Sequence, residues 1–568
     1  MSLNLNIPRY ENLKDLIDSC ISFFEKNKDR VNNELVRERR NKLSTFIEEF
    51  HRESGTLTPK VKEKIMVLRQ EVPVVLMTAH QPNLFPYSGV MRKATLIFTL
   101  GRELERHLGT KVITFFGIAD QDFSDDRWVK SSLLPAITRK DGKLTLRINL
   151  PEKTMLNNIP KPSINQINKW KDEIETWLHN AIYTNNNFWK ENGILNWDYK
   201  KSLLHHNFEI FWEIVKDAHG RAITYSDFNA FIISKIVNES WGYDTLFSRF
   251  SDCQKTFVDE FNSLLTDFSD YSSSLKEIIE FLYKKEDKKR VSKEETELLP
   301  FWYHCNCGSK ARLSLCNQKD SIIGHGFCIN CSKEFNINLG KVDNADVTAY
   351  ASNISARAIP MILVFSKGLG LTCYIGGIGG TEYLKEAIYL AKKININIPP
   401  IVYWRPRDKY LGISQLEALS EYKSITGNDN IYKYEEEIKH LKNRIKDIYK
   451  QISILELKKE ELIIKLRNES INMEKFKKDL KNILDEIAKI KKSSNLSILN
   501  HDLKTLRNIP TILTLIPNII DYAINIGLNK TSEQWIDFLL KNGSFSSEVY
   551  LKSLLADITE YEKIYLRL

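Results

Sequence analysis

Cysteine is scarce in this chain and unevenly placed. Only eight of the 568 residues are cysteine, and five of these lie between positions 305 and 331. A small secreted scaffold carries cysteines throughout its length, so this distribution excludes a disulfide framework and favours a reducing compartment. One local cluster is left to be explained.

Long apolar runs are also absent. The first twenty residues, MSLNLNIPRYENLKDLIDSC, hold no apolar stretch of signal-peptide length, and no run of about 18 apolar residues occurs anywhere. We therefore expect a cytoplasmic protein that does not enter a membrane.

Three common catalytic signatures are missing. The sequence has no G-x-S-x-G elbow, no Walker A loop and no H-E-x-x-H motif. Their absence argues against the usual serine hydrolases, P-loop proteins and zinc peptidases.

The net charge of +9 is concentrated in one region. Residues 431–492 hold 17 Lys and Arg against 12 Asp and Glu, which accounts for +5 of it. Because the signs alternate along this segment, a solvated helix face explains them better than a phosphate-binding surface. Nucleic acid is therefore not an expected partner.

Alternating strands and helices predict an α/β fold. The run from Val72 to Met77 is followed by a loop, a helix over about 90–108 and a second apolar strand over 111–119. This βαβ pattern indicates a parallel sheet with a right-handed crossover. Further strands are predicted at 361–365, 371–375 and 401–404, so the sheet is expected to come from two separated halves of the chain.

A long helical repeat follows the second half. Apolar residues recur in steps of three and four from Ile431 to Leu455 and again from Met473 to Ile490, which is a heptad seam. A continuous helix here would span about 90 Å and could pair two subunits. A turn at Asn468-Glu469-Ser470 would instead fold it into a hairpin.

The cysteine cluster predicts a structural zinc site. Cys305 and Cys307 precede Cys328 and Cys331 by about twenty residues, and four thiolates so spaced can surround Zn²⁺ as a closed tetrahedron. His304 remains an alternative ligand to Cys305, and Cys316 is a spare thiol. A four-ligand site leaves no position open for substrate.

These patterns divide the chain into consecutive parts. We expect an N-terminal helical segment (1–70), the first half of the sheet core (71–160, with turn-linked β structure over 125–155) and a helical connecting insertion (161–300). A zinc ribbon (301–340), the second half of the core (341–425), a coiled coil (426–495) and a helical cap (496–568) follow.

Polar residues follow the first strand. His80, Gln81 and Asn83 lie where ligands bind in open α/β sheets, and the helix after Gly89 offers free N–H groups to an anion. His80 could act as an acid or as a donor to phosphate. Alternatively, these side chains only satisfy a turn.

Two carboxylates follow the second strand. Asp120 and Asp122 are two residues apart, so in extended chain they would point the same way and could hold Mg²⁺ or an amine, or act as a base. A cap with a salt bridge is the alternative. Asp125 and Asp126 are better explained as capping or solvated residues.

Glycines and arginines mark the second half of the core. Gly376, Gly377 and Gly379 permit close approach of a ligand to the backbone, although a glycine turn alone is weak evidence. Arg357 and Arg405, with Arg407, could bind a carboxylate or phosphate, or form surface ion pairs.

Three stretches resemble the BshC family of bacillithiol synthesis. Thr78 to Tyr87 is similar to that family's T-G-Q-Q-x-G-L-F strand end, and Val112 to Phe123 is similar to its V-F-W-x-x-x-E-D-H-D-F. The third stretch runs from Ser352 through the glycines to Arg405. The chain is identified on these grounds as a divergent member with an inserted zinc ribbon; its H-Q-P-N-x-F-P-Y string is also similar to the start of the WbqC-like family, linked to surface-sugar synthesis.

The BshC resemblance implies a Rossmann-like core, a C-terminal coiled coil that pairs two subunits, and a cysteine ligase. The implied reaction joins L-cysteine to an amino-sugar conjugate of the glucosaminyl-malate type after activation by a nucleotide, ATP or ADP; Mg would accompany it at the aspartate pair. The implied pocket positions are Gln81, Phe85, Asp120, Asp122, Arg357, Gly376, Gly377, Gly379 and Arg405. The alternative function is a non-catalytic scaffold in which the zinc ribbon and coiled coil bind protein or nucleic acid.

Overall fold

The computed structural model describes residues 9–31, 33–71, 73–191, 196–266, 271–277, 298–318, 321–341, 344–377, 381–428 and 431–555. A parallel five-stranded sheet forms its centre, in the order β13-β12-β1-β2-β5. The strands are β1 (Val74–His80), β2 (Val112–Ile118), β5 (Leu246–Arg249), β12 (Leu371–Ile375) and β13 (Ile401–Val402). The predicted α/β class and parallel sheet are confirmed.

Both faces of this sheet are buried, as the unbroken apolar runs require. Val74 and Leu76 pack on one face with α1 (Leu13–Val31) and α4 (Ser88–Leu108). Val75 and Met77 pack on the other face with α2 (Glu34–Ser54), α3 (Pro59–Gln70) and α12 (Ala358–Leu369). Alternate residues of β1 thus serve opposite cores, and the sheet is the middle layer of three.

The strand predicted at Met361–Phe365 is wrong. These residues lie in α12, which begins after Arg357 and ends at Gly370, whose φ is 63°. Ile362 to Phe365 are all buried, so the segment is apolar on every side. A short apolar run fits a buried strand and a buried helix equally well, and no periodicity separates the two.

Strand β5 was not foreseen. It lies within the segment predicted to be helical, after α6 (Ile164–Glu191), α7 (Trp197–Arg221) and α8 (Tyr225–Lys235), and it pairs with β2 at the edge of the central sheet. The helical segment is therefore part of the core. Two short helices, α9 (Phe250–Cys253) and α10 (Val258–Thr266), follow it.

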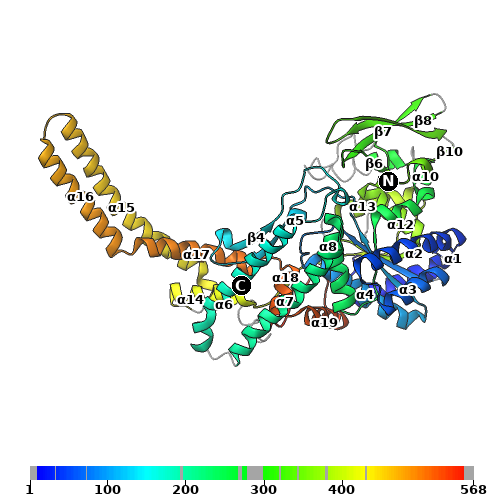
Figure 1. Ribbon diagram of the computed structural model, residues 1–568, viewed down its shortest axis with the longest axis horizontal. Helices are drawn as coiled ribbons and strands as arrows, with labels where there is room; N and C mark the ends of the chain where they lie inside the picture. The colour runs from blue at the N-terminus through cyan, green and yellow to red at the C-terminus, as the bar shows by residue number, and fades with distance from the viewer. Residues whose placement is uncertain are drawn as a thin grey trace.

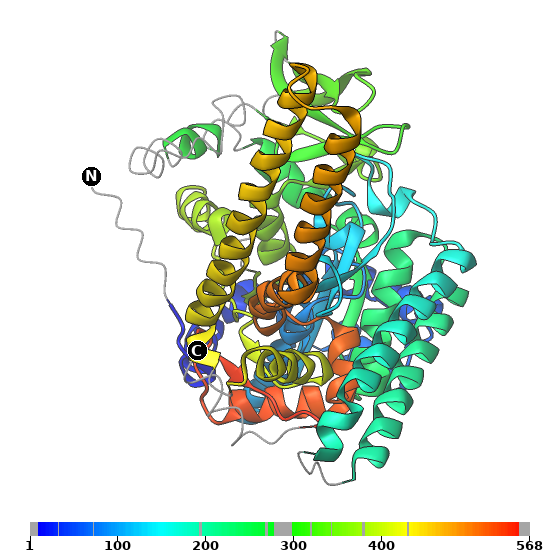
Figure 2. The ribbon, with the colours of Figure 1, turned by 90° about the vertical axis from the view of Figure 1, so that its left-hand side faces the viewer.

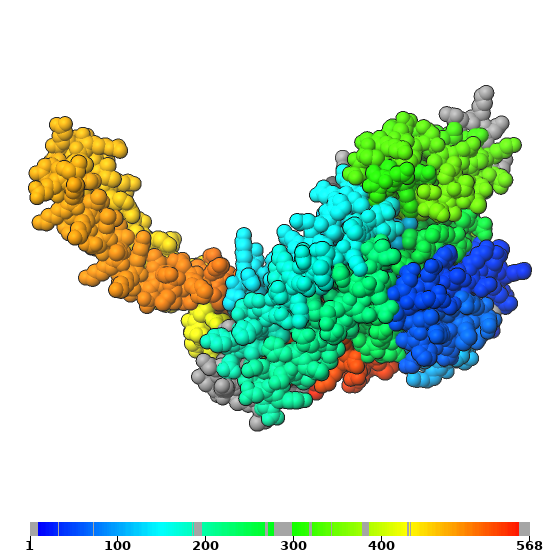
Figure 3. Space-filling view, viewed as in Figure 1, coloured from blue at the N-terminus to red at the C-terminus, as the bar shows by residue number. Residues whose placement is uncertain are grey.

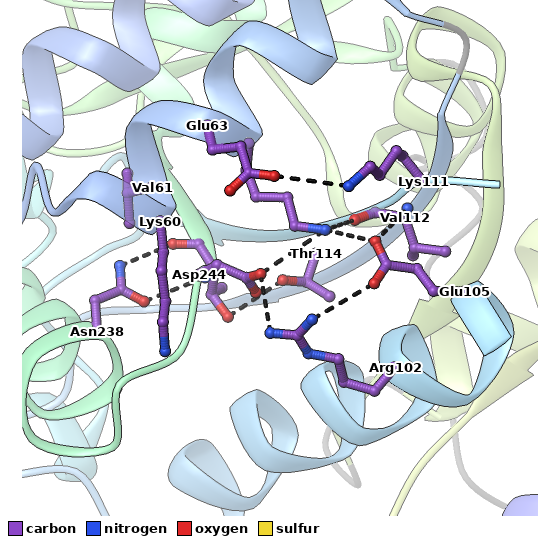
Figure 4. Close-up of polar contacts among 12 residues, drawn as sticks. Lys60, Val61, Glu63, Arg102, Glu105, Lys111, Val112, Thr114, Asn238 and Asp244 are labelled. Carbon is purple, nitrogen blue, oxygen red and sulfur yellow. Dashed lines mark hydrogen bonds and ion pairs between the residues drawn. The ribbon is translucent and has the colours of Figure 1, made fainter. Parts of the chain in front are cut away.

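The amino ends of β2 and β5 are fixed by a charged network (Figure 4). Lys64 Nζ donates to Glu105 Oε1 at 2.6 Å and to the Val112 carbonyl at 2.8 Å. Arg102 reaches both Glu105 and Asp244. These contacts hold helices α3 and α4 to the amino ends of the strands, opposite to the carboxyl ends that carry the predicted site residues.

The cysteine cluster belongs to a second, antiparallel sheet (Figure 1, top right). Its order is β10-β9-β8-β7-β6-β11. The strands are β6 (Phe301–His304), β7 (Lys310–Gln318), β8 (Ser321–Cys328), β9 (Glu334–Lys341), β10 (Asn344–Ala345) and β11 (Ile354–Ala356). Strand β11 leads directly into α12, which packs on the central sheet, so this end of the second sheet is joined to the core.

The long helical repeat is a hairpin. Helices α15 (Tyr434–Arg467) and α16 (Met473–Ser493) lie side by side and project from the body (Figures 1 and 2). Ser470 N donates to the Lys465 carbonyl at 2.9 Å in the turn between them. The prediction of one continuous helix is therefore wrong, and the hairpin alternative is confirmed. In the space-filling view the hairpin stands apart from the cysteine-bearing sheet (Figure 3).

The remaining elements brace the body. Residues 125–155 contain the predicted β structure, a hairpin of β3 (Ser131–Pro135) and β4 (Lys143–Arg147) after α5 (Arg127–Lys130). The others are α13 (Thr381–Lys393), β14 (Asp408–Lys409), α14 (Ile413–Thr426), α17 (Leu496–Thr514), α18 (Ile519–Asn525), α19 (Leu528–Leu540) and β15 (Val549–Tyr550). None of the helices in the described ranges is both long and apolar enough to cross a membrane.

Candidate functional site

The carboxyl ends of the central strands bring the predicted residues to one edge. His80 lies opposite Ile118 in the β1–β2 register, and Thr78 lies opposite Ile375 in the β1–β12 register. The chain segments that follow β1, β2 and β12 therefore start side by side. They carry His80, Asp120 and Gly376, as the sequence predicts.

Asp120 is a buried carboxylate held by one serine. Its side chain is 0% exposed. Ser251, in α9 just beyond β5, donates its N–H to Oδ1 at 3.0 Å and its hydroxyl to Oδ2 at 2.5 Å. Burial raises the pKa of Asp120 to about 6, against the lowering effect of Ser251 and of the Arg249 charge. A carboxylate of this pKa can accept and release a proton near neutral pH.

Asp122 differs from Asp120 in exposure, since Asp120 is buried and Asp122 is exposed. The strand ends at Ile118, and the chain then turns, with Asp122 N donating to the Ala119 carbonyl at 3.2 Å. Residues two apart share a direction only in extended chain, and the chain is not extended here. Asp122 is accessible to solvent, and the surrounding protein raises its pKa while the positive charge of Lys310 lowers it.

Lys310 reaches this edge from the second sheet. It is the first residue of β7, is buried, and lies with Nζ 4.8 Å from the Phe123 ring centroid. Burial lowers its pKa to about 8, while the charges of Asp122 and Asp120 raise it. The positive charge of Lys310 thus interacts with both carboxylates. Sequence reasoning missed it, because only the docking of the two sheets brings it here.

A second buried lysine lies beneath the end of β1. Lys93 of α4 donates to the Ala79 carbonyl at 2.9 Å, and burial lowers its pKa to about 7. A Cβ at Gly377 would lie 3.1 Å from Lys93 Nζ, so the glycine leaves room for the ammonium group. In the sequence Lys93 is an ordinary helical lysine, and only the burial of the continuous run from Val90 to Ile97 of α4 distinguishes it.

His80 is neutral at physiological pH. Burial at the strand ends and the charge of Lys93 lower its pKa to about 3, and its Nδ1 lies 2.9 Å from the Gln81 carbonyl. The ring can therefore donate or accept a hydrogen bond but is not an imidazolium acid. The amide of Asn83 is buried beside it and makes no hydrogen bond of ordinary geometry.

The other predicted residues are spread more widely. Phe85 is 1% exposed and packs in the core against Trp170, Phe211, Trp212 and Phe228, rather than lining the strand ends. Arg357 precedes α12 with its guanidinium 5.4 Å from the Trp302 ring centroid, and Arg405 is exposed. Gln81 is half-buried, and Gly379 lies outside the described residues.

The acidic residues next along the chain behave as predicted. Asp126 accepts from Trp128 N at 2.7 Å and caps α5, and Asp125 accepts from Lys153 N at 3.1 Å. Both are exposed.

Four cysteines form the candidate metal centre. The Sγ atoms of Cys305, Cys307, Cys328 and Cys331 all lie within 4.8 Å of one another. Cys305 and Cys331 are 3.5 Å apart at Sγ, and Cys307 and Cys328 are 3.6 Å apart. Four thiolates at about 2.3 Å from a zinc ion are about 3.8 Å apart, so the cluster could hold such an ion. His304 and Cys316 are not members of this group.

The turn that carries Cys305 and Cys307 is hydrogen-bonded to the strand-end site. The Gly308 carbonyl accepts from Met155 N at 2.8 Å. The next two residues donate to the site: Leu156 N to the Asp122 carbonyl at 3.1 Å, and Asn157 N to the Asp120 carbonyl at 2.9 Å. The cysteine turn therefore supports the loop that orients both aspartates.

A cleft of about 640 Å³ lies between this turn and the strand ends. A second cleft of about 460 Å³ adjoins it and reaches Asp120; the two share Asn157, Ser251 and Asp252. The carboxyl edge of the sheet is thus open to a ligand on the side of the cysteine cluster.

Comparison with known proteins adds no relative. No family model matches the chain, and no curated protein matches it either.

Proposed function

We propose that this chain is a BshC-like ligase that joins the carboxyl group of L-cysteine to the amine of an amino-sugar conjugate of the glucosaminyl-malate type. The main support is Asp120, a buried carboxylate with a pKa near 6 at the carboxyl edge of a parallel sheet, within the electrostatic reach of the buried Lys310. A second buried lysine, Lys93, lies at the same edge, beneath the end of β1. Ligands bind at this edge in open α/β sheets.

The acceptor amine needs a base. An amine attacks only when it is uncharged, and at pH 7 most Asp120 is ionised and able to take its proton. A C–N bond forms, a C–O bond of the cysteine carboxyl breaks, and the amine proton passes to Asp120. Asp122, accessible to solvent, relays that proton outward.

The carboxylate donor needs positive charge. Lys310 neutralises the oxygens of the cysteine carboxyl, and Lys93 beneath Gly377 faces the phosphate side of the site. A nucleotide, ATP in this proposal, would lie against Gly376, Gly377 and Lys93 and supply the leaving group by taking one carboxylate oxygen. His80, neutral, donates or accepts a hydrogen bond there.

Magnesium is not assigned to Asp120 and Asp122. Among the described residues, the only group of three or more His, Cys, Asp or Glu side chains able to hold an ion is the four-cysteine cluster. Both carboxylate oxygens of Asp120 already accept hydrogen bonds from Ser251, whereas the charged neighbour of Asp122 is Lys310. Zinc at the cysteines is the metal that we propose, in a structural role.

Incubation of the protein with L-cysteine, ATP and glucosaminyl-malate tests the ligase. Mass spectrometry should detect the amide product, and the Asp120→Asn variant should lose it at least a hundredfold. Asp125→Asn is the matched control, because Asp125 is exposed and contacts only the edge of the site. Full activity in Asp120→Asn would show that Asp120 is not the base of this reaction.

A scaffold function is the second candidate, and the projecting hairpin favours it. Ile454, Leu457 and Ile464 of α15 are each more than half exposed on a helix that stands away from the body. Such a surface fits a protein partner. Retention of nucleic acid that weakens with salt would instead indicate a nucleic-acid scaffold, and absence of both amide product and ligand binding would favour the scaffold over the ligase.

A further inference from the structure

The larger cleft has walls from both sheets. Gln121 follows β2, Ser251 and Asp252 lie in α9 beyond β5, and Asn157 belongs to the supporting loop. The opposite wall is the turn Cys305, Asn306, Cys307 and Gly308. A volume of about 640 Å³ is sufficient for a small ligand such as a sugar.

The lining is polar and rich in amides. Besides the residues above it includes the amides of Asn158 and Asn353, and its two charged side chains, Asp252 and Lys255, pair with each other at 3.3 Å. Amide side chains both donate and accept hydrogen bonds, and so does each hydroxyl of a sugar. None of the described lining residues is Phe, Tyr or Trp, so the cleft has no ring on which a nucleobase could stack.

Three lining residues carry polar atoms that lack partners. Gln121 Oε1, Asn157 Oδ1 and His304 Nε2 are buried and make no hydrogen bond, and the whole Gln121 side chain is only 6% exposed. A buried polar atom without a partner destabilises the unliganded protein. These atoms lie just behind the surface of the cleft, so the hydroxyl groups of a ligand would satisfy them once their side chains turn toward it.

We propose that this cleft binds an uncharged, hydroxyl-rich sugar ring through its amides, with the cysteine turn as one wall. The inference rests on the proposed function in one respect: the ring would be that of the acceptor amino sugar, whose amine then lies toward Asp120 in the adjoining cleft. The turn keeps its shape because Cys305 and Cys307 are both ligands of the proposed zinc, and the Gly308–Met155 hydrogen bond joins it to the facing wall.

Binding of three probes to the zinc-loaded, full-length protein tests this site. Glucosamine has the ring hydroxyls and an amine, glucose has the hydroxyls alone, and cyclohexylamine has the amine alone. Calorimetry should detect glucosamine and glucose but not cyclohexylamine. Binding of cyclohexylamine as tightly as glucosamine would overturn the proposal.

The two cysteine turns offer a matched pair of variants. Asn306 and Asn330 are both exposed asparagines between cluster cysteines, but only Asn306 lines the cleft. Asn306→Ala should raise the Kd of glucose about fivefold to tenfold, whereas Asn330→Ala should leave it unchanged. Gln121→Met should give a similar rise; equal effects of the two Asn variants, or none from Asn306→Ala and Gln121→Met, would sink the proposal.

Failure of this site and failure of the ligase are distinguishable. If glucose binds and Asn306→Ala weakens it, the cleft stands even when no amide product forms. If the amide forms but its KM for the amino sugar is the same in Asn306→Ala and Asn330→Ala, the ligase stands and the cleft does not hold the acceptor. Preferential binding of a short peptide over glucose would assign the cleft to a peptide instead.

Discussion

The carbonyl oxygen of Gly308 accepts a 2.8 Å hydrogen bond from the backbone N–H of Met155. This bond joins a turn of the cysteine cluster to the loop whose next two residues bind the carbonyls of Asp122 and Asp120. A metal ion at the cysteines would therefore stabilise the walls of the strand-end site without touching a ligand.

Metal analysis should find about one zinc per chain. Cys331→Ser should lose it, because Cys331 Sγ lies 3.5 Å from Cys305 Sγ, while Cys316→Ser and His304→Gln should retain it. Plasma mass spectrometry measures the content. Zinc retained by Cys331→Ser and lost by Cys316→Ser would mean a different ligand set.

Chelation should unfold the cysteine-bearing sheet before the central sheet. Limited proteolysis after chelation should first cut residues 301–340, because the four thiolates link β6 and β7 to the turn after β8. Simultaneous cleavage throughout the chain would show that the zinc instead supports the whole body.

Asp120→Asn should change the dependence of stability on pH. The pKa of Asp120 is raised in the folded state to about 6 from a usual 3.8, so the stability that it contributes is present below pH 3.8 and is lost as pH rises through 6. Relative to wild type, the variant should gain about 2 kcal/mol between pH 4 and pH 8. Denaturation in urea at both pH values measures this.

The serine that binds Asp120 supplies the control for that measurement. The hydroxyl of Ser251 lowers the pKa of Asp120, so Ser251→Ala should raise that pKa further. The loss of folding stability as pH rises should then be larger in Ser251→Ala than in wild type. A flat pH dependence in both wild type and Ser251→Ala would contradict the buried, titrating carboxyl.

Lys93→Met should stabilise the protein and abolish nucleotide binding. The pKa of Lys93 is lowered by burial to about 7 from 10.5, so stability is lost as pH falls through 7, when the buried amine becomes charged. The melting temperature should rise at pH 6 and less at pH 9, and ATP should no longer raise it. Lys62→Met, on an exposed part of α3, is the control.

The sequence was sufficient for the strands that define the site. Unbroken apolar runs predicted β1, β2, β12 and β13, and the polar residues after β1 and β2 predicted the edge at which Asp120 and His80 lie. The same criterion failed at Ile362–Phe365, since an apolar run long enough for one strand also fits a helix buried on all sides.

Other parts of the site depend on contacts that local patterns do not contain. Lys310 and Ser251 act on the aspartates only because the two sheets dock and because β5 pairs with β2. The exposure of Asp122 depends on a turn that begins at the end of β2, where extended geometry stops. Long-range packing decides each of these.

Subunit pairing through the hairpin remains a prediction. Ile454 and Ile464 are 56% and 54% exposed on one side of α15, where a second hairpin would cover them. Sedimentation at about 10 μM should give a dimer, and Ile454→Lys with Ile464→Lys should give a monomer of unchanged melting temperature. A wild-type monomer at that concentration would refute the pairing.

The order of the strands in the central sheet also governs how the chain can fold during its synthesis. β1 pairs on one side with β2, from which it is separated only by residues 81–111. On the other side it pairs with β12, whose first residue is Leu371. At about 5–20 residues per second, a ribosome needs on the order of ten seconds or more to make the intervening chain. Until then one edge of β1 has no partner strand, so a nascent chain must keep that edge from pairing with other chains. A chaperone that covers it should raise the yield of folded protein, and slower elongation should lower the yield.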